Sequence, residues 1–185
     1  MTITRGNWGA VAIWAMLPTL LFAQPTAAPA TRTDKCSDAA HHAFDFWIGV
    51  WTVTDTATGA AAGHSVVESL YAGCAIRENW VEPGYSGGSL NTYDAASGKW
   101  RQTWTDSSNS WREFVGGLES GNMVLTWRHP SLKDPTKEAW ERMTFTPNAD
   151  GSVRQHTQGS RDMGASWAEI YDYTYRREAR GARPG

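Results

Sequence analysis

The sequence predicts an all-β fold, an antiparallel up-and-down β-barrel of about ten strands. Two features of the sequence predict strands. The chain has 185 residues and includes 11 Trp, 6 Tyr and 5 Phe, and such large aromatic side chains suit the half-buried surfaces of sheets. From Gly49 onward, short alternating runs are separated by turn residues about every dozen positions. This spacing is typical of antiparallel sandwiches and barrels.

The connections favour a barrel over an open sheet. Most separators are short turns rich in Gly, Asn or Asp, so strands that are neighbours in sequence should pair in space. Closing the sheet on itself removes two unpaired edges. The expected strands are Gly49 to Asp55, His64 to Tyr71, Ala75 to Glu82, Gly87 to Asp94, Lys99 to Asp106, Ser110 to Gly117, Asn122 to Arg128, Glu138 to Pro147, Ser152 to Gly159 and Trp167 to Arg177.

An aromatic stretch precedes the first strand. His41 to Trp47 is too short to form a stable helix alone, so we expect one N-terminal helical turn that closes the barrel mouth. Gly49 and Trp51 form a Gly-x-Trp at the strand entrance. We expect this Trp to plug one end of the barrel.

Residues 1–23 are interpreted as a signal peptide. Arg5 gives a weakly positive start, Trp8 to Phe22 is an almost uncharged apolar run, and Ala23 offers a small residue for cleavage. The run is shorter than the ~20 residues of a membrane span. We therefore expect an exported protein, periplasmic or secreted, with no integral span in the mature chain. A retained signal anchor is the alternative.

The remaining chain divides by composition. Residues 24–40 are rich in Ala, Pro and Thr and are predicted to be a linker, residues 41–177 the barrel, and residues 178–185 a disordered tail. Cys36 and Cys74 are the only cysteines, and an oxidising compartment favours a disulfide between them. Two buried free thiols are the alternative.

Several function classes are excluded by composition and motif. The chain has 17 basic and 19 acidic residues without a basic block, which argues against a nucleic-acid partner. No nucleophile elbow, phosphate loop or dinucleotide fingerprint occurs. Ser160 to Trp167 fits the Asp-box pattern, which we interpret as the turn before the last strand. We assign no catalytic residue, because spacing selects no pair among the candidate carboxylates Glu78, Glu113, Glu141, Glu169 and Asp172.

The histidines do not form a metal-ligand pattern. Only His41 and His42 are close in sequence, and neighbours on an extended chain point in opposite directions. We expect no metal site. His156, inside a predicted strand, is the best single candidate for a haem ligand or an acid–base group, with a hydrogen-bonded wall residue as the alternative.

Alternating aromatic and polar residues on several strands indicate a small-molecule pocket. Along one predicted strand Glu78, Trp80 and Glu82 share a face. Which face points inward stays open, and a packing role for the aromatics is the alternative. The candidate ligand-binding residues are Trp80, Gln102, Trp104, Arg142, Gln155 and His156.

Six motifs together resemble a family of exported bacterial lipocalin-like domains of the calycin type. They are Phe44 to Trp51, Gly73-Cys74, Leu90-Asn91-x-Tyr93-Asp94, Trp100-Arg101-Gln102-Thr103-Trp104-x-Asp106, Asp150 to Gln155 and the closing Tyr175-Arg176-Arg177. The resemblance covers His41 to Arg177 and implies a barrel but no reaction. By analogy with calycins, it also implies that Trp51 forms a cation–π contact with Arg176 or Arg177.

The layout is also distantly similar to nitrobindin, which carries haem through a histidine near the end of its barrel. The predicted last strand, Glu169 to Tyr175, contains no histidine. We therefore expect no cofactor, with haem as the alternative. The leading hypothesis is an exported barrel that holds a small, largely apolar molecule. The alternatives are an enzyme, by nitrobindin-like haem isomerisation or by hydrolysis, and a cell-envelope interaction module.

Overall fold

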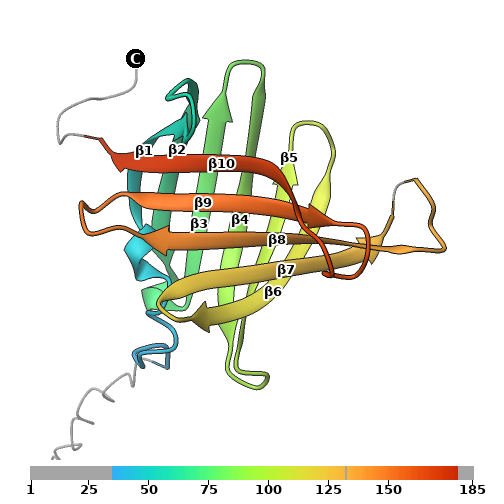
Figure 1. Cartoon of the computed structure of the whole chain (residues 1–185). Helices are drawn as coiled ribbons and strands as arrows, with labels where there is room; N and C mark the ends of the chain where they lie inside the picture. The colour runs from blue at the N-terminus through green and yellow to red at the C-terminus, as the bar shows by residue number, and fades with distance from the viewer. Residues whose placement is uncertain (1–34, 132, 179–185) are drawn as a thin grey trace, which may run out of the picture. The chain divides into compact units, whose positions relative to one another are not determined.

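The computed structural model describes residues 35–131 and 133–178, which form a closed antiparallel β-barrel of ten strands (Figure 1). This confirms the predicted fold class. The expected signal peptide, the linker up to residue 34 and the tail from residue 179 lie outside the described residues.

The strands follow the predicted segments closely. They are β1 (Gly49–Asp55), β2 (Ala61–Leu70), β3 (Ala75–Glu82), β4 (Tyr85–Asp94), β5 (Lys99–Asp106), β6 (Trp111–Glu119), β7 (Asn122–Pro130), β8 (Glu138–Pro147), β9 (Val153–Ser160) and β10 (Ala168–Arg177). The bounds of β1, β3, β5 and β8 are those predicted, and the other ends differ by three residues or fewer.

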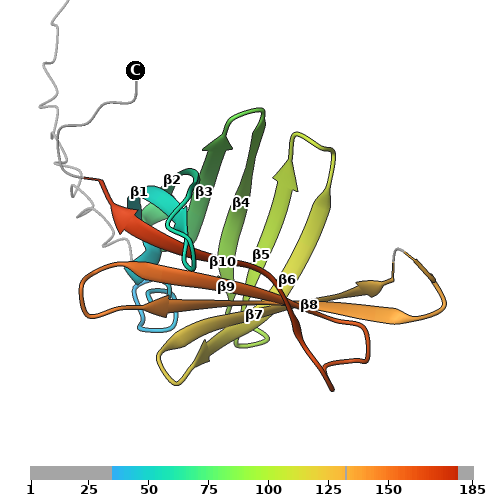
Figure 2. The same cartoon turned by 45° about the horizontal axis from the view of Figure 1, so that its top comes forward.

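Every strand pairs with its sequence neighbours, and β10 closes the ring by pairing with β1. At the closure Trp51 lies opposite Arg177, and Thr54 lies opposite Thr174. Figures 1 and 2 both show β10, in red, beside β1. The order is that of an up-and-down barrel, as expected when each connection joins adjacent antiparallel strands.

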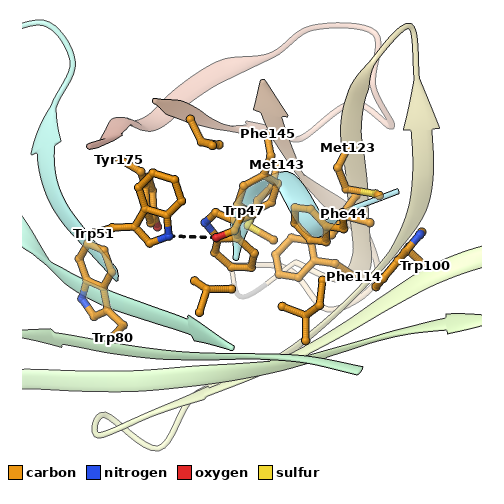
Figure 3. Close-up of a cluster of buried hydrophobic side chains, with 14 of the residues drawn as sticks. Phe44, Trp47, Trp51, Trp80, Trp100, Phe114, Met123, Met143, Phe145 and Tyr175 are labelled. Atoms are coloured by element: carbon orange, nitrogen blue, oxygen red, sulfur yellow. Dashed lines mark hydrogen bonds between the residues drawn. The ribbon is translucent and has the colours of Figure 1, made fainter. Parts of the chain in front are cut away.

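One end of the barrel is filled by the aromatic stretch before β1. The 3₁₀ turn η1 (Asp45–Trp47) inserts Trp47, and Trp47 and the preceding Phe44 are fully buried. The Trp47 ring centroid lies 4.8 Å from that of Phe145 and 6.1 Å from that of Tyr175 (Figure 3). A second 3₁₀ turn, η2 (Tyr71–Gly73), joins β2 to β3 at the same end. The helical turn predicted over His41 to Trp47 is therefore present as a shorter turn that closes this end.

Trp51 lies beneath an arginine at the β1–β10 junction. The guanidinium carbon of Arg177 is 4.4 Å from the Trp51 ring centroid, and Arg177 donates a hydrogen bond to the Ile48 carbonyl oxygen at 2.9 Å. A Cβ at Gly49 would lie 2.5 Å from the Arg177 guanidinium, so glycine makes this packing possible. Of the two expected partners, Arg177 covers Trp51, and Arg176 bonds the exposed Asp150 carboxylate at 3.2 Å.

The predicted disulfide joins Cys36 to Cys74. It fastens the segment before η1 to the corner between β2 and β3. The indole nitrogen of Trp100 also donates to the Ala40 carbonyl oxygen at 3.1 Å. The segment that leads into the aromatic stretch is thus attached to the barrel at two points, Cys36 and Ala40.

None of the helical turns among the described residues is long and apolar enough to cross a membrane.

Candidate ligand-binding cavity

The barrel end opposite η1 contains a cavity of about 320 Å³. Small-molecule pockets occupy about 300–1,000 Å³, so this volume suits a ligand of modest size. The cavity is lined by Glu78, Trp80, Glu82, Tyr85, Gln102, Trp104, Arg112, Phe114, Glu141, Met143, Gln155, Ile170, Tyr171, Tyr173 and Tyr175.

The indoles of Trp80 and Trp104 reach the cavity because glycines lie beside them. Alternate residues of a strand point to the same side, which brings Trp80 of β3 and Trp104 of β5 inward. A Cβ at Gly63 would lie 2.6 Å from a ring carbon of Trp80, and one at Gly87 would lie 2.5 Å from a ring carbon of Trp104. These two glycines leave the space in which the indoles lie.

One wall of the cavity consists of stacked rings from β3 and β10. The rings of Trp80 and Tyr173 are 5.9 Å apart with 9° between their planes. Tyr171 stacks on Tyr173 at 4.6 Å. Alternation along β10 also brings Tyr175 inward, where it is almost fully buried. The wall therefore presents several aromatic faces and edges to the interior.

Asp106 fixes the orientation of Trp104. Its side chain is 1% exposed, and its Oδ2 atom accepts hydrogen bonds from the Trp104 indole and the Tyr85 hydroxyl, both at 2.9 Å. Burial raises the pKa of Asp106, but hydrogen bonds from Ser108, Ser110, Trp104 and Tyr85 outweigh it and hold the pKa well below its usual range. Asp106 therefore remains a carboxylate that positions two cavity residues.

Glu78 is a buried acid on the inner face of β3. It is 4% exposed, and its two carboxyl oxygens accept hydrogen bonds from Ser65 at 2.9 Å and Ser89 at 3.2 Å. Burial raises the pKa of Glu78 to about 7, and these hydroxyls oppose the rise only in part. The network continues as Asn91 donates to Ser89 at 3.0 Å and Gln102 donates to Asn91 at 2.7 Å.

A second polar network joins β8, β9 and β10. The Tyr175 hydroxyl donates to Gln155 Oε1 at 2.6 Å, and Gln155 Nε2 donates to the Tyr171 hydroxyl oxygen at 3.3 Å. Burial holds the pKa of Tyr171 and Tyr175 well above the usual range. Both tyrosines therefore stay neutral at physiological pH.

Four of the six candidate ligand-binding residues come together here. Trp80, Gln102, Trp104 and Gln155 all line the cavity. Their role in binding stays a prediction.

Arg142 and His156 do not line this cavity. On β8 the inward residues are Glu141 and Met143, so Arg142 between them points outward. There its guanidinium lies 4.0 Å from the Trp167 ring centroid and donates to Gln158 at 2.8 Å. The candidate Arg142 therefore does not line this cavity, because the inward face of β8 carries its neighbours Glu141 and Met143.

His156 lies outside the barrel for the same reason, because it follows the inward Gln155 on β9. Its Nε2 atom is 3.3 Å from a carboxylate oxygen of Glu169. Among the described residues that line the cavity none is histidine. The expectation of no cofactor, with haem as the alternative, stays a prediction.

Within residues 35–131 and 133–178, one three-residue group has metal-ligand composition: His156, Glu169 and Asp172 on the outer face, with ligand atoms within 4.8 Å of one another. Asp172 already accepts two hydrogen bonds from Arg154, at 2.8 and 2.5 Å. Because the arginine offsets that charge, the group is explained as a surface ion-pair network.

The Asp-box motif forms the turn between β9 and β10, as interpreted. Asp162 accepts hydrogen bonds from Ser160 Oγ at 2.7 Å and from the Ser166 backbone N–H at 2.8 Å. The hydroxyl of Ser166 is the main cause that lowers the pKa of Asp162 to about 2. The motif therefore has a structural role in the turn.

Neither a scan against protein-family models nor a search of the curated proteins finds a match to this chain. The lipocalin-like resemblance stays a prediction.

Sequence reasoning missed several cavity residues. Tyr171, Tyr173 and Tyr175 alternate along β10, which is a signal that all three share a face. Arg112 and Phe114 follow the same rule on β6. The missing information was which face of each strand points inward.

Proposed function

We propose that this protein binds one small, largely apolar molecule inside its barrel and works outside the cytosol. The observation that carries the proposal is the cavity of about 320 Å³, whose fifteen lining residues include seven with aromatic rings and six with polar or charged side chains. Apolar lining supplies affinity, and the few polar groups fix the orientation of the ligand.

The contrast between the barrel ends supports a binding role. At the η1 end Phe44, Trp47 and Phe145 are completely buried and fill the interior. At the other end Trp104 and Tyr173 pack against the core but stay partly exposed. The same barrel thus has one packed end and one end with accessible aromatic surface.

The lining favours a flat ligand. Rings from β3, β5, β6 and β10 surround the space, and aromatic groups pack well against one another in stacked or edge-to-face arrangements. Gln102 and Gln155 supply amide groups among these rings. A small aromatic or alicyclic compound with one polar substituent matches these surroundings.

The disulfide supports the exported location. Disulfides persist in oxidising compartments such as the periplasm and the cell exterior, and are rare in the cytosol. Cys36 and Cys74 form such a bond. We include export in the proposal for this reason.

The binding proposal is tested by NMR with 2-phenylethanol as a neutral probe. The indole N–H signals of Trp80 and Trp104 should shift on titration, and that of Trp111, which is 57% exposed on the outer face, should not. Replacing Trp104→Ala should weaken binding about tenfold or more, since an aromatic contact is lost, whereas Trp111→Ala should leave it unchanged. Titrations that shift none of the cavity indoles would overturn the proposal.

Native mass spectrometry of protein purified from its own host identifies the natural ligand. The expected spectrum contains a mass increment that is lost on denaturation. Protein carrying the Trp104→Ala substitution should retain less of the compound than the Trp111→Ala control.

A further inference from the structure

We infer that the natural ligand is an organic cation, an amine whose charged nitrogen is bound by Glu78 while its apolar body lies among the aromatic rings. This inference rests on the proposed function, since it names the chemical class that the cavity takes. It follows from the partners of Glu78, the charge of the lining and the rings around it.

Glu78 is a buried acid that is held by hydroxyl groups alone. In the described part of the chain its hydrogen-bond donors are the hydroxyls of Ser65 and Ser89, with no cation among them. Buried carboxylates are normally paired, because removing an unpaired charge from water is costly. A glutamine of the same shape would accept hydrogen bonds here without that cost. The ionised Glu78 side chain therefore needs a cationic partner, and a ligand would supply one.

The ionisable lining has an excess of negative charge. Glu78, Glu82 and Glu141 face one cationic side chain, Arg112, so the lining holds two more carboxyl groups than guanidinium groups. Arg112 is already engaged, with its Nε atom 3.8 Å from a Glu141 oxygen. An anionic ligand would meet repulsion from the remaining carboxylates, whereas a cation would be attracted.

The rings near Glu78 suit a cation as well as an apolar group. Trp80 is two residues from Glu78 on the same face of β3, and it stacks on Tyr173. Aromatic faces carry partial negative charge and attract ammonium groups, and Trp does so most strongly. The carboxylate and the rings therefore favour the same ligand group.

Binding of such a ligand depends on pH. The titratable groups of the strands around Glu78 are Glu82, Tyr85, Asp106, Arg112, Glu141, Tyr171, Tyr173 and Tyr175. Burial holds the pKa of Tyr171 and Tyr175 above the usual range, so they stay neutral. Because the pKa of Glu78 is about 7, its carboxylate form becomes dominant between pH 6 and 8. A cation should bind more tightly as pH rises through this window.

The test uses three probes of similar shape: 2-phenylethylamine, 2-phenylethanol and phenylacetate. At pH 8 the amine should bind at least tenfold more tightly than the alcohol, and phenylacetate should bind most weakly. On lowering the pH to 6, amine affinity should fall about tenfold, as the ionised fraction of a group with a pKa near 7 falls by about that factor. Calorimetry measures the affinities, and the cavity indole signals report the site.

Glu78→Gln provides the matched variant. It should abolish the preference for amine over alcohol, whereas Glu113→Gln, which changes an exposed residue on the outer face of β6, should preserve it. If the Glu78→Gln protein does not fold, the pH dependence of the unmodified protein still decides the question.

The outcomes separate the two proposals. Two results would overturn the cation inference and leave the binding function standing. One is equal affinity for amine and alcohol at both pH values, and the other is phenylacetate binding most tightly of the three probes. If none of the probes perturbs the cavity indoles, both proposals are overturned.

Discussion

Glu78 makes the stability of the folded chain depend on pH. Burial raises its pKa from 4.5 to about 7, so between these values the folded state holds a proton that the unfolded chain releases. This proton stabilises the folded state relative to the unfolded chain. The stabilisation is fully present below pH 4.5 and is lost as pH rises through about 7.

We predict that the free energy of unfolding falls between pH 5 and 8 by up to about 3 kcal/mol more in the unmodified protein than in Glu78→Gln. Urea denaturation at the two pH values measures the difference. Glu113→Gln is the control and should behave like the unmodified protein. The account of Glu78 is wrong if the Gln variant shows the same pH dependence.

Asp106 is a second acid at the cavity, and its role is to position Trp104. Asp106→Asn should lower the free energy of unfolding by about 1–3 kcal/mol, because an amide cannot accept all the hydrogen bonds that the buried carboxylate receives. It should also broaden or shift the Trp104 indole signal. Asp150→Asn, at an exposed carboxylate, should leave that signal in place. An unmoved Trp104 signal in the Asp106 variant would refute the positioning role.

The disulfide links the segment before η1 to the corner between β2 and β3. It joins residues separated by 38 positions, and closing a loop of that length stabilises by about 4 kcal/mol in the chain-entropy model. The double replacement Cys36→Ser with Cys74→Ser should therefore lower the free energy of unfolding by about that amount. Unmodified protein under reducing conditions should show a similar loss. A loss below about 1 kcal/mol would show that the aromatic contacts of the segment are sufficient without it.

Strand positions were predictable, and strand faces were not. Turn residues and alternation locate each hairpin, which is why the bounds of β1, β3, β5 and β8 match the prediction. The faces were ambiguous because both sides carry aromatics. Trp80 points inward, whereas the outward Trp140 is covered by Arg128 at 4.1 Å from its ring centroid. An arginine over an indole shields it from water, so aromatic content does not distinguish core from surface here.

The buried acid Glu78 also made the inner face of β3 difficult to predict. A rule that places polar residues outside assigns Glu78 to the surface, although it lies inside with Ser65, Ser89 and Asn91. These polar residues come from β2, β3 and β4 and meet when the three neighbouring strands pair in the observed register, in which Glu78 lies opposite Ser89. A network of this kind depends on the register and on the inward face of each strand, which a single sequence does not display.

Closure of the whole barrel depends on the junction of β1 and β10. Arg177→Met removes the contact over Trp51 and the hydrogen bond to Ile48, and it should lower the free energy of unfolding by about 1–2 kcal/mol. Arg176→Met is a matched control one residue away. Its ion pair with Asp150 is exposed on both sides, so its loss should change the free energy of unfolding much less than the loss of Arg177 does. Equal effects of the two substitutions would contradict the assignment of Arg177 to the closure.

The proposed function depends on a closed barrel that has one end packed and the other hollow. Figure 3 shows the packed side, with Trp47 between the rings of Tyr175 and Phe145. The hollow side has aromatic walls and the acid Glu78. A crystal structure of the protein soaked with 2-phenylethylamine at pH 8 tests this account most directly. We predict that the ring lies among Trp80, Trp104 and Tyr173, with the nitrogen at the Glu78 carboxylate. A cavity that holds only water while the crystals contain saturating amine would contradict it.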